Sequence, residues 1–93
     1  MTTRLLDVDM AHVNVTYRGL SGDLVDPVRR DASSEEVIAF AEEAIRGGSV
    51  RGMPADPNAR LVGYHAGPPL EPDAEAGRTT YTFIVRPKTG FGR

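Results

Sequence analysis

A single helix with a clear start and a clear end limits the folds open to this chain. Ser33 precedes Glu36 by three residues, the spacing of a capping box, and Glu35 adds charge at the positive end of the helix dipole. Gly47-Gly48 then supplies a permissive C-cap. Between these ends, apolar residues recur at helical spacing at Val37, Ile38, Ala41, Ala44 and Ile45. One helix with one apolar stripe needs a second apolar surface to cover, and the rest of the chain must supply it.

Two segments with alternating apolar residues flank this helix. Residues 7–18 place Val13, Val15 and Tyr17 on one face, and residues 79–86 are rich in β-branched and aromatic side chains. Alternation with a period of two predicts a strand in each segment. In the second segment one face holds Thr79, Tyr81, Phe83 and Val85, and the other holds Thr80, Thr82, Ile84 and Arg86.

Two weaker strands complete the pattern. Residues 23–30 follow a predicted tight turn at residues 19–22, so the first two strands should form a hairpin. Pro27 assigns the returning strand to the edge of the sheet, because proline has no amide donor. Residues 60–66 form a short strand before the last one.

The predicted order is strand, strand, helix, strand, strand in one domain. Residues 47–58 and 67–77 are rich in Gly, Pro and small residues, so we expect irregular connections there. The helix can bury its stripe only by crossing one face of the sheet, with the strong last strand paired centrally. We therefore predict an α+β fold of the β-grasp (ββαββ) type, a mixed sheet with one helix packed across one face.

Several further positions carry the same pattern along the chain. They are Gly19 and Gly22; Val28 nine residues before Val37, through Asp31-Ala32-Ser33; Gly52-Met53-Pro54-Ala55-Asp56 before Arg60-Leu61-Val62; Ala66-Gly67; Leu70-Glu71; Gly77-Arg78-Thr79; and Thr80 to Arg86. With these positions the chain resembles the ubiquitin-like proteins over roughly residues 13–86. The resemblance implies a single ubiquitin-like β-grasp domain over residues 1–93, with a flexible tail at residues 87–93.

The C-terminus departs from the family pattern. Ubiquitin-type modifiers and the small sulfur carriers end in Gly-Gly, whose carboxylate is adenylated, whereas here Phe91 separates Gly90 from Gly92 and Arg93 follows. Phe91 would obstruct the narrow channel of an activating enzyme, and Arg93 would have to be removed to expose Gly92. Lys88 is the single lysine, so chains built on lysine are not expected. A protein modifier or sulfur carrier activated at a processed C-terminal glycine is therefore the alternative hypothesis.

Charge and composition disfavour several classes of function. The chain has 11 Lys and Arg against 13 Asp and Glu, a net charge of -2, so we expect no nucleic-acid partner. Arg18, Arg29 and Arg30 could form a small basic patch, which on an edge strand more often meets the carboxylates of a partner. No run of 18 apolar residues occurs, so we expect no membrane partner and a cytoplasmic location, or a virion for a phage protein.

The residues that carry enzyme chemistry are not arranged in a recognisable motif. The chain has no Cys, and His12 and His65 do not fall at metal-ligand spacing. No Gly-x-Ser-x-Gly motif occurs, and Ser33 is explained as a helix cap. We therefore expect no catalytic residues, no metal site and no cofactor.

The most consistent function is a non-catalytic ubiquitin-like protein-interaction module, a small subunit or adaptor in a larger protein assembly such as a phage or other shell. The partners would be other protein subunits, in an oligomeric assembly. Because the helix covers one sheet face, partners should meet the other face, an edge or the tail, at an apolar patch rimmed by Arg. The candidate protein-binding residues are Ile84, Arg86, Val62, Tyr64 and Phe91, with Gly90 and Gly92 in the C-terminal tail.

Overall fold

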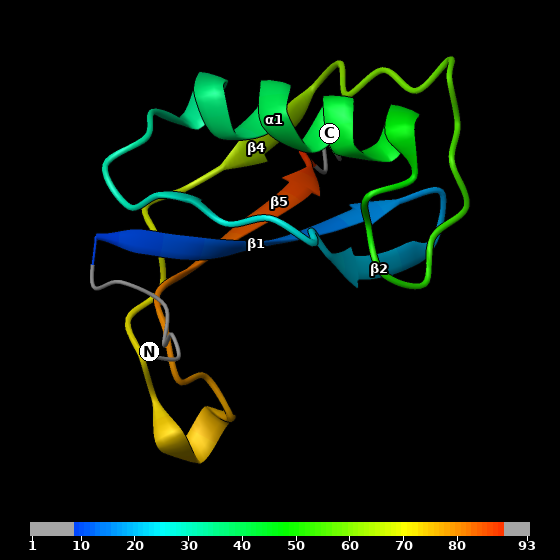
Figure 1. Cartoon of the computed structure of the whole chain (residues 1–93). Helices are drawn as coiled ribbons and strands as arrows, with labels where there is room; N and C mark the ends of the chain where they lie inside the picture. The colour runs from blue at the N-terminus through cyan, green and yellow to red at the C-terminus, as the bar shows by residue number, and fades with distance from the viewer. Residues whose placement is uncertain (1–8, 89–93) are drawn as a thin grey trace, which may run out of the picture.

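The computed structural model describes residues 9–88, in which one helix lies across one face of a mixed β-sheet (Figure 1). In chain order the elements are β1 (Met10–Tyr17), β2 (Leu20–Asp23), β3 (Val28–Arg29), α1 (Ser34–Gly47), β4 (Tyr64–Ala66), the 3₁₀ helix η1 (Ala74–Ala76) and β5 (Thr82–Pro87). The sheet order is β2-β1-β5-β4, and β3 pairs with β1. The predicted α+β β-grasp fold is confirmed.

The two strongest predicted strands form the centre of the sheet. β1 and β5 run parallel, with Val13 opposite Phe83 and Val15 opposite Val85. These four side chains are almost fully buried, because central strands place one face of the sheet beneath the helix. The remaining strand pairs are antiparallel. The central position expected for the last strand is therefore confirmed.

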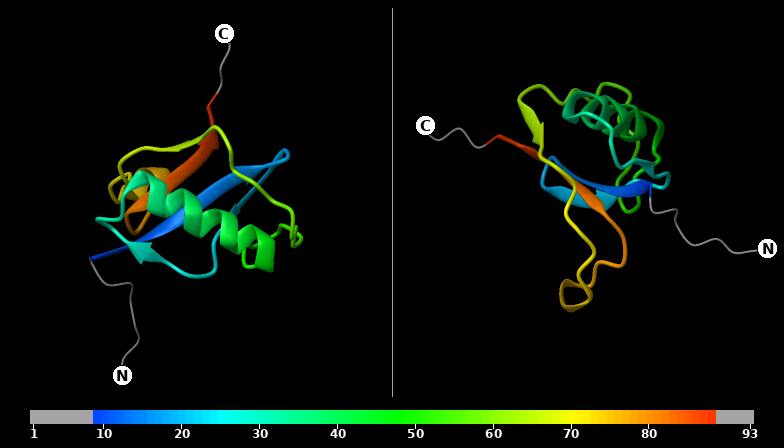
Figure 2. Two further views of the ribbon diagram at one scale, coloured as in Figure 1. Left: turned by 90° about the horizontal axis from the view of Figure 1, so that it is seen from above. Right: turned by 90° about the vertical axis from the view of Figure 1, so that its left-hand side faces the viewer.

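Helix α1 begins and ends at the predicted signals. The Ser33 side chain accepts a hydrogen bond from the amide of Glu36, and the Glu36 carboxylate accepts one from the amide of Ser33 at 2.8 Å. Gly48 adopts the left-handed conformation with φ of 78° and closes the helix. Val37, Ala41 and Ile45 are fully buried against the sheet. Local capping and one apolar stripe together position this helix across the sheet (Figure 2).

The predicted edge strand over residues 23–30 is divided into two short strands. β2 ends at Asp23 and β3 begins at Val28, and both pair with β1. Between them Leu24 turns inward and pairs with Val50. Pro27, which has no amide to donate, lies in the gap and explains why one continuous strand does not form.

The turn between β1 and β2 is tighter than predicted. Arg18 and Gly19 form a two-residue loop, with φ of 53° and 80°. Gly22 was expected to serve this turn, but it lies in β2 opposite Val15, where a Cβ atom would overlap the carbonyl oxygen of Arg51. Gly22 is therefore required by the close approach of a loop, which is a correction to its predicted role.

The connection after α1 forms neither helix nor strand, as expected, and it is hydrogen-bonded to the chain at the end of β2 and just beyond it. The amide of Val25 donates to the carbonyl of Ser49 at 2.9 Å, and the amide of Arg51 donates to the carbonyl of Asp23 at 2.9 Å. These bonds satisfy backbone groups that an exposed edge strand would leave unpaired.

The predicted strand over residues 60–66 is shorter in the structure. Only Tyr64–Ala66 pairs with β5, and a turn at Val62 and Gly63 precedes it. Gly63 has φ of 78°, which the turn requires.

The connection between β4 and β5 contains an arm, here defined as residues 70–81. Leu70 and Thr82 exchange two backbone hydrogen bonds of 2.8 and 3.0 Å, and Asp73 pairs with Arg78. Helix η1 forms the end of the arm, which projects away from the side of the sheet that α1 covers (Figures 1 and 2). The segment predicted to be irregular and exposed is thus exposed but organised as a narrow hairpin.

Candidate functional site

The sheet face that α1 leaves open carries mostly polar side chains. Strand alternation places on it every second residue of the four main strands, opposite the buried residues. These residues are His12, Asn14, Thr16, Ser21, Asp23, His65, Thr82, Ile84 and Arg86. Because the strands are hydrogen-bonded to one another, these side chains have fixed relative positions.

A row of hydrogen bonds crosses this face from one edge toward the other. Asn14 donates from Nδ2 to Asp23 Oδ1 at 2.7 Å, and Arg86 donates from Nη2 to Asn14 Oδ1 at 2.8 Å. Arg86 Nη1 also donates to the carbonyl of Val85 at 3.0 Å. The Arg86 guanidinium is thereby held against the sheet. Arg86 is half-buried because of this network, and its charge does not stand free at the rim of the open face.

A groove of about 350 Å³ lies on the open face beside the arm. His12, Asn14, Thr82 and Ile84 line it from the sheet, and Leu70 and Arg78 line it from the arm. Leu70 is 40% exposed and Ile84 is half-buried. The two aliphatic side chains therefore border one groove whose other lining groups are donors and acceptors.

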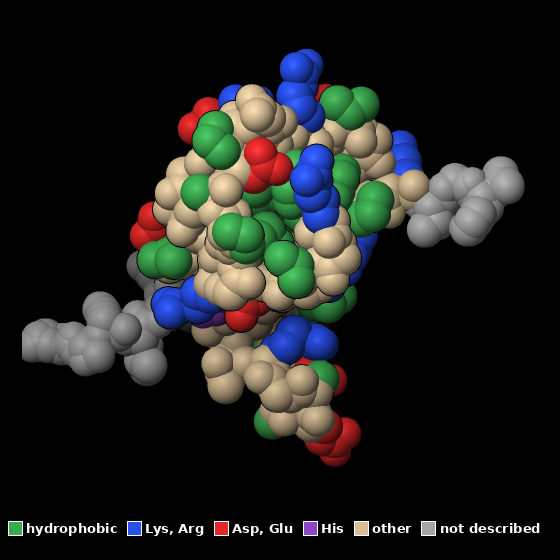
Figure 3. Space-filling view, turned by 90° about the vertical axis from the view of Figure 1, so that its right-hand side faces the viewer, with side chains coloured by type: hydrophobic (Ala, Val, Ile, Leu, Met, Phe, Trp, Pro, Cys, Tyr) green, Lys and Arg blue, Asp and Glu red, His purple; other side chains and the backbone are tan. Residues whose placement is uncertain are grey.

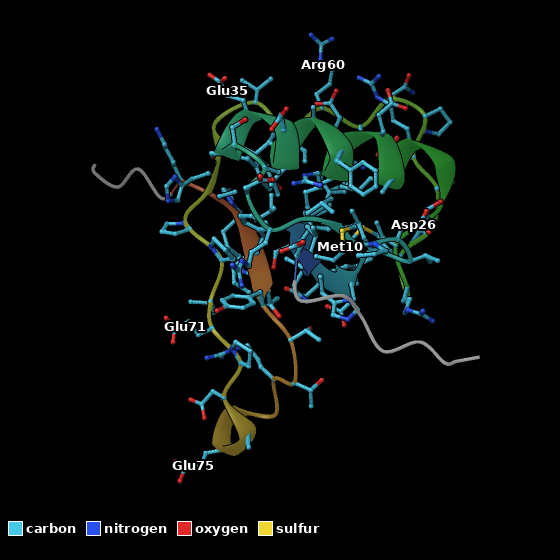
Figure 4. The ribbon with its side chains drawn as sticks, turned by 60° about the vertical axis from the view of Figure 1, so that its left-hand side comes forward. Met10, Asp26, Glu35, Arg60, Glu71 and Glu75 are labelled. Carbon is cyan, nitrogen blue, oxygen red and sulfur yellow. The ribbon has the colours of Figure 1, made fainter. Side chains whose placement is uncertain are left out.

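Polar contacts within the arm support this groove. Arg78 donates from Nε to the carbonyl of Glu71 at 3.0 Å, and its Nη2 lies 3.9 Å from Asp73 Oδ2. Asp73 also caps η1 by accepting a hydrogen bond from the amide of Glu75. Figure 4 shows Glu75 at the tip of the arm, directed away from the sheet. The arm therefore has its own hydrogen bonds, which keep Leu70 beside the groove without help from a ligand.

The structure brings together only part of the predicted patch. Ile84 and Arg86 lie on the open face as expected. Tyr64 shares the face of Ala66, packs against the core and has a pKa raised by burial of its hydroxyl, so it lies on the side opposite Ile84. Val62 precedes β4 in a turn and is 81% exposed. The expected grouping of Ile84 with Val62 or Tyr64 is therefore not formed, because His65 is the β4 residue that shares the open face.

Leu70 is the apolar neighbour that sequence reasoning missed. It lies in a segment predicted to be irregular, where no periodicity assigns a side chain to a face. A usable signal was nevertheless present, because Leu70 is the single large aliphatic residue between positions 67 and 80. The predicted tail residues Gly90, Phe91 and Gly92 lie outside the described residues.

A second groove lies on the other side of the molecule, between α1 and β3. Met10, Val28 and Phe40 line it, and Phe40 is 36% exposed. At its rim the Arg29 guanidinium donates to the Asp31 carboxylate at 3.1 Å, and this hydrogen bond lowers the pKa of Asp31. Phe40 therefore offers an exposed apolar side chain remote from the open face.

Two kinds of site are not found in residues 9–88. No group of three or more His, Asp or Glu side chains there could hold a metal ion. No helix of this part of the chain is long and apolar enough to cross a membrane.

No family model matches the chain, and no curated protein and no solved structure shows significant similarity to it.

Proposed function

We propose that this chain is a non-catalytic, ubiquitin-like protein-interaction module that acts as a small subunit or adaptor in a larger protein assembly. It binds a partner protein in the open-face groove. The observation that carries the proposal is the pair of aliphatic side chains, Leu70 and Ile84, that border a groove otherwise lined by hydrogen-bonding groups.

The composition of the groove suits a short segment of a partner. An apolar side chain of the partner would lie between Leu70 and Ile84, where its burial removes apolar surface from water on both sides. His12, Asn14 and Thr82 would then meet polar groups that flank this side chain. Because the sheet and the arm hold these groups in place, little conformational entropy would be lost on binding.

The fold supports the ubiquitin-like part of the proposal. The element order, the parallel pair β1 and β5 at the centre and the single helix across one face agree with a β-grasp domain. Domains of this kind commonly act through residues on their surfaces. The fold requires the core residues, and the open-face residues are not among them, so they can serve binding.

The test begins by identifying partners. The tagged full chain is used to capture proteins from host extract, the captured proteins are identified by mass spectrometry, and light scattering gives the stoichiometry of each complex. Binding of the identified partner is then measured by calorimetry for the parent, Ile84→Asp, Leu70→Asp and the control Phe40→Asp.

We expect Ile84→Asp and Leu70→Asp each to weaken binding at least about tenfold, which corresponds to about 1.4 kcal/mol. Phe40→Asp should bind as the parent does, because Phe40 lies on the helix side. Circular dichroism of each variant reports whether it is folded, and Leu70→Asp is informative even if Ile84→Asp unfolds. If both open-face variants bind as the parent does and Phe40→Asp loses binding, the binding site is the groove between α1 and β3 and not the open-face groove.

A further inference from the structure

The turn between β1 and β2 contains an unusual residue. Arg18 is the one non-glycine residue with positive φ among residues 9–88. Together with Gly19 it forms a two-residue loop in which both residues are left-handed, positions at which Asn, Asp and Gly are preferred. An arginine there carries a steric penalty that Asn would largely avoid, so the backbone does not explain the choice of residue.

A hollow of about 270 Å³ lies beside this turn. Tyr17, Leu20, Met53, Pro54 and Ala55 line it, with Arg18 and Asp56 as its charged residues. Leu20 is 44% exposed, and the side chain of Met53 can adapt its shape to an occupant. Figure 3 looks at this end of the molecule and shows hydrophobic side chains gathered around a hollow, with acidic and basic side chains close by.

The Asp56 carboxylate accepts hydrogen bonds within the protein. Tyr17 donates from its hydroxyl to Asp56 Oδ2 at 2.8 Å, and the amide of Asn58 donates to Asp56 Oδ1 at 3.0 Å. These hydrogen bonds, first of all the one from Tyr17, hold the pKa of Asp56 below its ordinary value, and the bond to Asp56 raises the pKa of Tyr17. Asp56 therefore acts as a structural acceptor that stays ionised, and Arg18, whose charge also lowers the pKa of Asp56, is the exposed cation beside it.

The Arg18 side chain is exposed and is placed over an aromatic ring. Its Cζ atom lies 5.7 Å from the centroid of the Tyr17 ring, at the edge of the hollow. Within residues 9–88 the guanidinium forms no ion pair with a carboxylate. A guanidinium presents paired donors that match a carboxylate, so an acidic group is the complementary ligand.

We propose that this hollow, with Arg18 at its edge, binds a short acidic and apolar segment of a partner protein. An Asp or Glu carboxylate of the segment pairs with the Arg18 guanidinium, and an adjacent aliphatic side chain enters the hollow between Leu20 and Met53. The site goes beyond the proposed open-face function, because the residues that line the two grooves do not overlap. Either site can therefore fail without affecting the evidence for the other.

The test is a titration of the isotope-labelled full chain with a defined peptide, followed by amide NMR spectra. The probe is acetyl-Gly-Ser-Asp-Leu-Ser-Gly-amide, and its matched uncharged control replaces Asp by Asn. We expect the Asp peptide, added to about 10 mM, to shift the amide signals of Gly19, Leu20 and Ala55. The Asn peptide should bind at least about tenfold more weakly, because it cannot form the ion pair.

The decisive variant is Arg18→Asn, which forms an Asn-Gly turn suited to the same backbone. It should lose at least about tenfold in affinity for the Asp peptide while its thermal unfolding temperature stays equal or rises. Arg60→Gln removes an exposed charge on the helix side and should bind as the parent does (Figure 4). The proposal is wrong if both peptides bind equally, if the shifts lie on the open face, or if Arg18→Asn binds as tightly as the parent.

Discussion

Single residues in this protein have roles that depend on distant parts of the chain. Gly22 lies in a strand, yet its lack of a side chain matters because the backbone of Arg51 crosses β2 at that position. Tyr17 and Asp56 are 39 positions apart and form a 2.8 Å hydrogen bond that joins β1 to the connection after α1. Both contacts attach this connection to the hairpin, so the loop after the helix is part of the fold and not an appendage.

Substitution of Gly22 by Ala should destabilise the protein. The added Cβ would meet the Arg51 carbonyl oxygen and lie 2.9 Å from Cγ1 of Val50, so the loop must shift, at a cost of about 1–3 kcal/mol. Gly47→Ala is the matched control, since a Cβ there meets no atom within 4 Å and the residue lies in the helix. Denaturant unfolding of both variants measures the difference. Equal stability of the parent and Gly22→Ala would show that the loop does not press on β2.

The hydrogen bond from Tyr17 to Asp56 should make stability depend on pH. The folded-state pKa of Asp56 lies below the unfolded value of about 3.9, so its contribution is complete above that pH and is lost as pH falls through the folded pKa. The pKa of Tyr17 is raised by the same bond, so the contribution of Tyr17 is complete below about pH 10 and is lost as pH rises through the folded pKa.

We therefore expect the parent to be more stable than Asp56→Asn at neutral pH, with a difference that shrinks as pH falls below about 4. Denaturant midpoints measured across the pH range give this difference. Asp26→Asn, at an exposed position, is the control for a general change in charge. If the difference in stability between the parent and Asp56→Asn stays constant down to the lowest pH measured, the Asp56 carboxylate does not stabilise the fold.

The secondary structure elements combine local signals with contacts between layers. Helix α1 has its own cap at each end, but a helix of 14 residues is marginal alone in water. Its stability comes from packing Val37, Ala41 and Ile45 against the sheet, where the helix contacts β4, β5 and β1. Glu42 adds a contact at the other side of the helix, where its Oε1 accepts a hydrogen bond from the amide of Leu61 at 2.9 Å. The helix thus holds both the sheet and the segment that leads to β4.

Removal of part of the Ile45 side chain should weaken this packing strongly. Ile45 is fully buried, so Ile45→Ala should lower the free energy of unfolding by about 2–4 kcal/mol through lost apolar burial and a cavity. Ala39→Gly, on the exposed side of the same helix, should cost only about 1 kcal/mol from helix propensity. Thermal and denaturant unfolding give both values. Similar losses for the two variants would mean that the helix does not pack on the sheet through Ile45.

At the scale of the whole molecule, the surfaces divide into a helix side, an open sheet face and a hairpin end. The arm changes the open face most, because it places Leu70 beside Ile84 and closes one side of the groove. The hairpin end has a separate hollow with its own charged residues, Arg18 and Asp56. The residues that line these two surfaces do not overlap, which agrees with the proposed function because an adaptor must contact two partner segments at once.

Much of the architecture was predictable from the sequence because the signals are local. The spacing of Ser33 and Glu36 defines the helix start within one turn, and the alternation around Val13 and Phe83 identifies the buried face of each central strand. The order of these elements then leaves few ways to bury one helical stripe, so the β-grasp arrangement follows from the pattern.

The composition of the surfaces was decided only by the tertiary structure. β4 begins at Tyr64, four residues after the predicted start of that strand, and the pairing of His65 with Arg86 places Tyr64 on the helix side of the sheet, away from Ile84. Leu70 reached the groove through backbone pairing with Thr82, and Arg18 reached its hollow because the loop carrying Met53 folds back on the hairpin. Short irregular segments have no periodicity that assigns their side chains to a face, so contacts between distant parts of the chain determine where those side chains lie.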